Sequence, residues 1–117
     1  ADQPLEVEAF FENKDIGFLR QGQVAEVKVE TFQFTKYGTL HAELASVSHD
    51  AISDEQRGLI YASRVRLART SLDVDGMEVR LSPGMAVTVE VKTGRRRVIE
   101  YFLAPLLRHT DESLRER

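Results

Sequence analysis

Hydrophobic and polar residues alternate with a period of two along most of the chain. In residues 25–29, for example, Ala25, Val27 and Val29 alternate with two charged residues. Successive side chains of a strand point to opposite faces, so this pattern predicts strands with one buried and one solvated face. The runs that show it are residues 5–9, 25–29, 40–44, 61–67 and 87–91.

Turn residues separate these runs. Asp75-Gly76 stands between the β-patterned segments 72–74 and 78–81, and an Asp-Gly pair in this position predicts a tight hairpin. Ser82-Pro83-Gly84 predicts a second turn before the last alternating run. The polar segment 48–58 is typical of a surface loop.

Two segments lack the alternation. Residues 13–19 predict a helix of one or two turns, with Asn13 as its N-cap and with Gly17 limiting its length. The tail from residue 97 has apolar residues at helical spacing, and Pro105 is expected to kink or restart the helix there. These apolar residues are Val98, Ile99, Phe102, Leu103, Leu106 and Leu107.

The predicted fold is mainly β, in a chain of 117 residues that has the size of one domain. Six or seven short strands favour a small antiparallel β-barrel, because closure removes exposed strand edges. One short helix and a C-terminal helical tail complete the prediction. We assign residues 1–96 to the barrel and residues 97–117 to an amphipathic tail.

Composition narrows the functional classes. The net charge of −3, without a basic stripe, argues against nucleic-acid binding. The absence of cysteine excludes disulfides and thiolate metal sites. No apolar stretch reaches the roughly 18 residues of a membrane span. Because the chain begins with Ala1, we interpret it as a processed protein or a part of a larger one.

The chemical motifs favour structural interpretations. Asp73-Val74-Asp75-Gly76 resembles the start of a calcium loop, but the later glutamate spacing is missing, so a hairpin turn is favoured. Ser48-His49-Asp50 is not a catalytic triad, since adjacent strand residues point to opposite faces. His41, His49 and His109 show no metal-ligand spacing. The sequence therefore predicts no enzyme activity, no metal and no cofactor.

Two clusters are candidate partner contacts. The first contains Phe34, Lys36 and Tyr37, where aromatic area favours a core-plugging or subunit-contact role over stacking on bases. The second is the run Arg95, Arg96 and Arg97, which is either a solvated turn or a contact with anionic lipid headgroups or an acidic exporter surface. The apolar tail that follows either docks at such a surface or covers the open end of the barrel.

Several motifs, in order along the chain, resemble haemolysin-D-type periplasmic adaptors, also called membrane fusion proteins, of type I secretion systems. The segments that carry the resemblance are 12–18, 22–29, 34–40, 81–94, 98–106 and the ending Ser113-Leu114-Arg115-Glu116-Arg117. Each is weak alone, but together they span nearly the whole chain. The resemblance identifies the chain as the C-terminal β-barrel domain of such an adaptor.

The resemblance implies a set of partners and a location. In the full-length protein these are an inner-membrane ABC exporter, other adaptor copies in a ring, and a TolC-like outer-membrane channel reached through parts absent here. The location implied is the periplasm, with an anchor in the inner membrane and peripheral contact of this domain with that membrane. Two alternatives remain open: an adaptor of a tripartite small-molecule efflux pump, and an oligosaccharide- or oligonucleotide-binding β-barrel.

Overall fold

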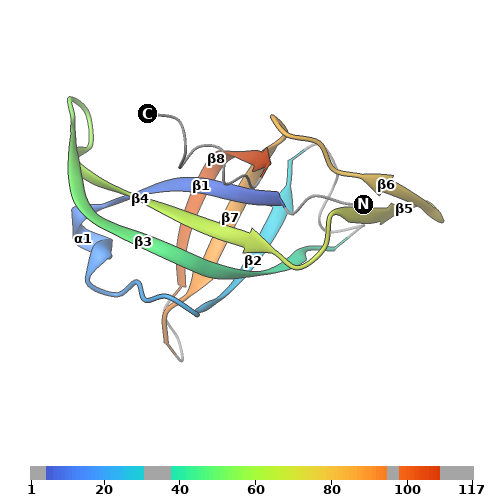
Figure 1. Ribbon diagram of the computed structural model, residues 1–117, viewed down its shortest axis with the longest axis horizontal. Helices are drawn as coiled ribbons and strands as arrows, with labels where there is room; N and C mark the ends of the chain where they lie inside the picture. Colours follow the sequence, from blue (N-terminus) through green and yellow to red (C-terminus); the bar gives the residue numbers. More distant parts are fainter. Residues whose placement is uncertain (1–4, 31–37, 95–97, 109–117) are drawn as a thin grey trace.

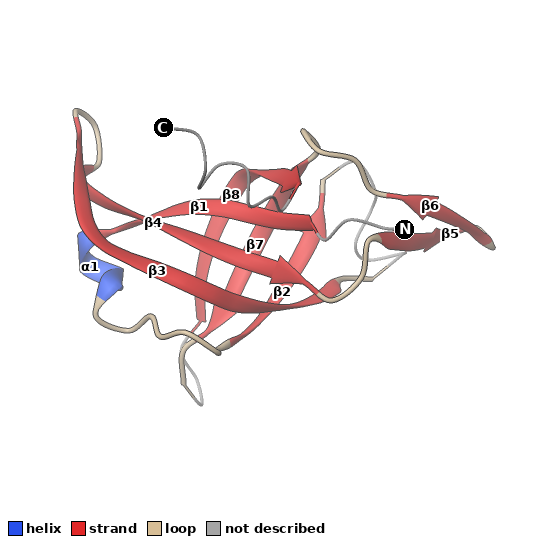
Figure 2. Cartoon of the chain, in the orientation of Figure 1, coloured by secondary structure: helices blue, strands red, loops and turns tan. Residues whose placement is uncertain are grey.

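The alternating segments form the strands of an antiparallel barrel in a computed structural model of the chain (Figure 1). The structure describes residues 5–30, 38–94 and, as backbone, 98–108. The elements are β1 (Leu5–Glu12), α1 (Asn13–Ile16), β2 (Val24–Val29), β3 (Leu40–Asp54), β4 (Gly58–Leu67), β5 (Ser71–Val74), β6 (Met77–Arg80), β7 (Ala86–Lys92) and β8 (Val98–Arg108). The predicted mainly β fold with a small barrel and a short helix is confirmed (Figure 2).

Six strands close the barrel in the order β1-β4-β3-β2-β7-β8, and every pairing is antiparallel. The ring is completed where β8 returns to β1, with Leu5 opposite Arg108 and Val7 opposite Leu106. The register shifts twice along β3 and once along β7. Such bulges bend strands and increase their twist, which a barrel of few strands requires.

The inward faces of the strands fill the barrel with side chains. Val7, Val27, Leu44 and Val89 are each fully buried, and Phe11 is 2% exposed. All the alternating apolar positions predicted from the sequence are buried except Tyr61, which is half-buried. A six-stranded barrel is narrower than the eight-stranded barrels whose interiors side chains just fill. Along the strands whose side chains the structure describes, the inside is therefore packed core and leaves no channel for a passing molecule.

β5 and β6 form a separate two-stranded hairpin that projects from one end of the barrel (Figure 1). Its base is held in the core by Leu72 and Leu81, which are 5% and 7% exposed. The turn at Asp75-Gly76 has positive φ at both residues, 53° and 83°, as a type I′ turn demands. The predicted hairpin is thus confirmed.

The turn supplies a first test of stability. Replacing Gly76 with alanine places a side chain at φ 83° and should destabilise the chain by about 1 kcal/mol. The matched control is Gly17→Ala, because Gly17 has an ordinary φ of −68° and open space around its Cα. Urea denaturation measures both. Equal midpoints for the two variants would show that the turn does not need its left-handed geometry.

The short helix is confirmed, but its start differs from the prediction. α1 begins at Asn13, and the N-cap position belongs to Glu12, whose side chain makes no capping bond. The side chain of Asn13 instead accepts a hydrogen bond from the Tyr61 hydroxyl on β4 at 3.0 Å. A tertiary contact has therefore replaced the local one.

The predicted C-terminal helix is wrong over residues 98–108, which form β8. A short apolar run fits a buried strand as well as a helix, and Val98, Ile99, Tyr101 and Phe102 are of types that favour strands. Pairing decides between the two, because β8 covers the edges of β1 and β7 that a helix would leave open.

The predicted loop at residues 48–58 is also largely strand. β3 runs to Asp54 and β4 starts at Gly58, so only residues 55–57 form the turn. The polar stretch contains an irregularity, since Val47 pairs with Ser63 and Ala51 with Tyr61. Its polar side chains bond locally; for example, the Ser48 hydroxyl accepts a hydrogen bond from the Asp50 amide at 3.0 Å.

Among the described residues, no helix is both long and apolar enough to traverse a lipid bilayer.

Candidate docking surfaces

The outer face of β2, β3 and β7 carries a network of charges. Glu26 is its centre: its carboxylate lies 2.9 Å from His41 Nδ1 and 3.9 Å from Lys92 Nζ, and it accepts a hydrogen bond from Thr39. Lys28 reaches Glu90 at 3.7 Å. Most of these pairs are partly exposed and each contributes little to stability, so the network mainly makes this face hydrophilic.

A second network covers β1 and β4. Glu6 points away from the barrel interior, yet it is only 4% exposed. Its two carboxylate oxygens lie 3.4 Å from Arg64 Nη1 and 3.6 Å from Arg66 Nε, and Arg64 also reaches Glu8 at 3.7 Å. The guanidinium groups compensate the buried charge, as a desolvated carboxylate requires.

The β3–β4 hairpin extends past the barrel at the end where α1 lies (Figure 1). Arg57 ties its tip to β1 by donating to the Phe10 carbonyl and by pairing with Glu12 at 3.3 Å. Asp54 accepts hydrogen bonds from the Arg57 and Gln56 amides at 2.8 and 3.1 Å. Ile52 and Leu59 remain about half exposed on this tip.

The β5–β6 hairpin has one apolar and one polar face. Leu72 lies opposite Val79 and Val74 opposite Met77, so these four side chains share a face. Met77 next to the turn is 70% exposed, the highest value among the exposed large hydrophobic residues that the structure describes. The polar face places Asp73 opposite Glu78.

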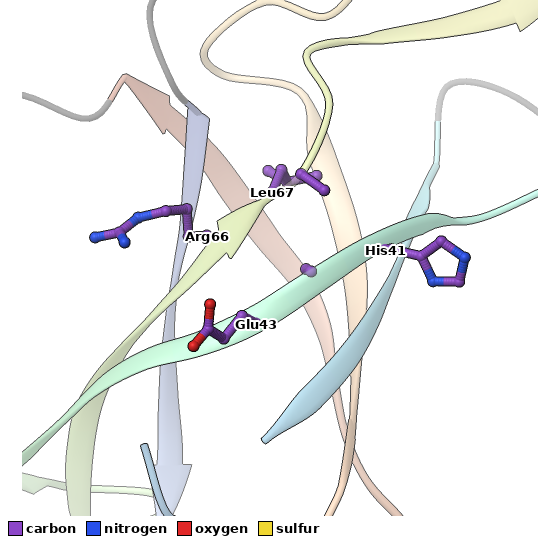
Figure 3. A pocket seen from close by; sticks show the side chains of 6 residues that line it. His41, Glu43, Arg66 and Leu67 are labelled. Carbon is purple, nitrogen blue, oxygen red and sulfur yellow. The ribbon is translucent and has the colours of Figure 1, made fainter. Parts of the chain in front are cut away.

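A shallow depression of about 210 Å³ lies where β4 ends beside β3 (Figure 3). Ala42, Leu67 and Ala68 supply its apolar lining. Its polar lining residues are Glu43 and His41 from β3 and Arg66 from β4, and Figure 3 shows these side chains projecting from the two strands.

No reaction centre is assembled by the described residues. They contain no group of three or more His, Asp or Glu side chains placed to hold a metal ion. Ser48, His49 and Asp50 lie in the irregular part of β3, where the Ser48 side chain bonds the Asp50 backbone, and His41 pairs with Glu26. Every buried side-chain nitrogen and oxygen among them has a hydrogen-bond partner. In the part of the chain that the structure describes, the charged and apolar surfaces above are therefore the candidate sites.

The predicted contact residues Phe34, Lys36, Tyr37, Arg95, Arg96 and Arg97 all lie outside the described residues. Their roles therefore stay predictions. Met77 and the depression beside Leu67 were missed by sequence reasoning. An apolar residue directly after an Asp-Gly turn could have indicated the exposed Met77. No signal in the sequence indicates the depression, whose lining residues near 42 and 67 meet only when β3 and β4 pair.

Comparison with known proteins places this barrel in a family. The model of the AprE-like β-barrel domain matches residues 5–94, which is most of the chain. The chain belongs to the AprE-like β-barrel domain family. This AprE-like match ends before β8, although β8 completes the sheet in this structure.

Curated relatives of this AprE-like domain are named as toxin determinants or as secretion proteins. RTX-I toxin determinant D of Actinobacillus pleuropneumoniae is 48% identical over 117 residues, and the plasmid-encoded haemolysin secretion protein D of Escherichia coli is 46% identical over 116. Leukotoxin secretion protein D of Mannheimia haemolytica is 44% identical over 117 residues. Each match covers 99% of the chain and 24% of the relative. The predicted resemblance to haemolysin-D-type adaptors is confirmed, and the chain spans about a quarter of the length of these relatives.

Proposed function

We propose that the chain is the β-barrel domain of a periplasmic adaptor of a type I protein secretion system. The whole adaptor would be anchored in the inner membrane and would link an ABC exporter there to a TolC-like outer-membrane channel. This domain would contact the exporter and neighbouring adaptor copies. The names of the relatives as toxin secretion proteins support protein cargo over small-molecule efflux.

The filled interior of the barrel is the observation that supports this proposal most, because it indicates the route that cargo would take. Large side chains with less than 2% relative exposure are spread over the strands, Leu40, Val65 and Val91 among them. Cargo therefore has to pass outside each barrel, in a space enclosed by several copies. In this mechanism the domain is a rigid wall segment that works by binding and shape, and it performs no bond chemistry.

The docking residues are proposed at both predicted clusters. Phe34, Lys36 and Tyr37 would contact a neighbouring copy, since aromatic side chains supply much of the binding energy of interfaces. Arg95, Arg96 and Arg97 would contact the exporter or anionic lipid headgroups, where a nearby anionic surface contributes about 1 kcal/mol per charge.

Photo-crosslinking in cells tests the proposal. The full-length adaptor would carry a photoreactive amino acid at position 37 or at position 96. Irradiation should join position 37 to a second adaptor copy and position 96 to the exporter, and deleting the exporter should abolish only the second product. An abundant, membrane-associated adaptor that yields neither product would contradict the proposed function.

A further inference from the structure

We propose that the tip of the β5–β6 hairpin docks, through Met77, into the depression beside Leu67 on a second copy of this chain. The inference rests on the proposed function, which requires several copies to pack side by side. It names the contact by which one copy meets the next.

The β5–β6 hairpin projects from the barrel and exposes an apolar side chain near its tip. A two-stranded hairpin alone is marginally stable, so this one depends on the buried anchors Leu72 and Leu81 at its base. Its outer end nevertheless presents Met77 at 70% exposure. Methionine is unbranched and flexible, and it adapts to irregular apolar surfaces.

The depression offers a receptor of matching size and chemistry. Its volume of about 210 Å³ has room for one flexible apolar side chain, and the exposed Ala68 lines it beside the buried Ala42 and Leu67. It lies at the end of β4, and the same end of the barrel leads through residues 68–70 into the hairpin. The hairpin and the depression therefore belong to the same end of the barrel, where a neighbouring copy can meet both.

Charged residues of opposite sign on the two surfaces also favour this contact. On the hairpin, Asp73 and Glu78 stand directly opposite each other, and like charges in this arrangement are unfavourable. At the depression, the exposed Arg69 follows Ala68 in sequence. Guanidinium groups brought up by a neighbour would relieve the repulsion between the two carboxylates.

The geometry of the contact is head-to-tail. A hairpin tip on one surface meets a depression on another, so each copy uses two different surfaces. Contacts of this kind generate a ring when the rotation between copies closes. A symmetric pair of copies, tip against tip, would use only one of the surfaces and would stop at two.

Disulfide trapping in cells tests this contact, and the chain is suited to it because it has no cysteine. Two tagged forms of the full-length adaptor, free of other cysteines, would carry Met77→Cys and Ala68→Cys respectively and be expressed together. Oxidation should yield a disulfide between the two forms, because only closely approaching residues can bridge. In the matched control, the second form carries Glu55→Cys in place of Ala68→Cys. Glu55 is exposed on the β3–β4 turn, and this pair of forms should yield no disulfide.

Charge reversal supplies a second readout. Asp73→Arg or Arg69→Asp alone should lower the yield of the disulfide severalfold, and the two changes together, one on each form, should restore it. A disulfide between two Met77→Cys forms, or none at all, would overturn the inference. If position 37 still crosslinks adaptor copies in that case, the proposed function stands and only the docking contact fails. If no adaptor–adaptor product forms at any position, both fail.

Discussion

Replacing Phe11 with alanine is expected to lower the free energy of unfolding by about 3–5 kcal/mol, the range for a large aromatic side chain removed from a core. Phe11 is 2% exposed and lies on the inward face of β1, opposite Tyr61 of β4. Buried side chains of β2, β3, β4 and β7 share this core, so the cavity left by the ring cannot collapse fully. A domain of this size is stabilised by about 5–15 kcal/mol, so the loss is a large share of the total.

The matched control is Phe18→Ala, which removes the same side chain from a position that is 42% exposed. We expect it to cost less than about 1 kcal/mol. Chemical denaturation of the two variants, followed by far-ultraviolet circular dichroism, gives both values. Similar losses would show that Phe11 does not sit in a packed interior, and the argument that cargo passes outside the barrel would lose its basis.

Ending the chain after Gly94 is expected to abolish cooperative folding. This truncation removes β8, which pairs with β7 from Lys92 to Ala86 and with β1 from Leu5 to Val7. Two strand edges would then be open, and open edges pair with other chains. The truncated chain retains all the residues that match the family model. The experiment therefore shows whether the matched segment can fold without β8.

The comparison chain ends after Arg108 and retains β8. It should unfold with the same midpoint as the 117-residue chain and should sediment as the same species. The chain of residues 1–94 should lack a cooperative transition and should aggregate. Cooperative unfolding of the shorter chain at an unchanged midpoint would contradict closure of the barrel by β8.

The barrel strands were predictable because local pattern and global fold agree in them. Val87, Val89 and Val91 alternate with polar residues, and all three are fully buried. The Asp75-Gly76 turn was predictable for a different reason, since few residue pairs adopt positive φ twice in succession. In these segments the nearest neighbours in the sequence already determine the conformation.

The prediction failed where distant pairing decides the structure. Residues 98–108 have helical spacing, but β1 and β7 each offer an edge that β8 pairs with. The polar residues near Ser48 signal a loop, but β4 holds β3 in register on both sides of the irregularity. Asn13 is a good capping residue, but the Tyr61 hydroxyl recruits its side chain. None of these partners is close in sequence.

The two proposed docking surfaces differ in the same way, because one depends on local sequence and the other on pairing between strands. The hairpin tip at Met77 is local and could be inferred from the turn before it. The depression needs Ala42 and Leu67, which are brought together by the pairing of β3 with β4. The resemblance to secretion adaptors was visible in the sequence because its motifs coincide with turns and with the strands they connect.

Closure of the sheet by β8 is the feature on which the filled core, and hence the docking role, depends. Nuclear Overhauser contacts between backbone protons in the 117-residue chain measure it directly. We predict cross-strand contacts from β8 to both neighbours, with residues 106–108 near residues 5–7 and residues 98–101 near residues 89–92. Sequential contacts typical of a helix over residues 98–108, with no contact to β1, would contradict the closed barrel.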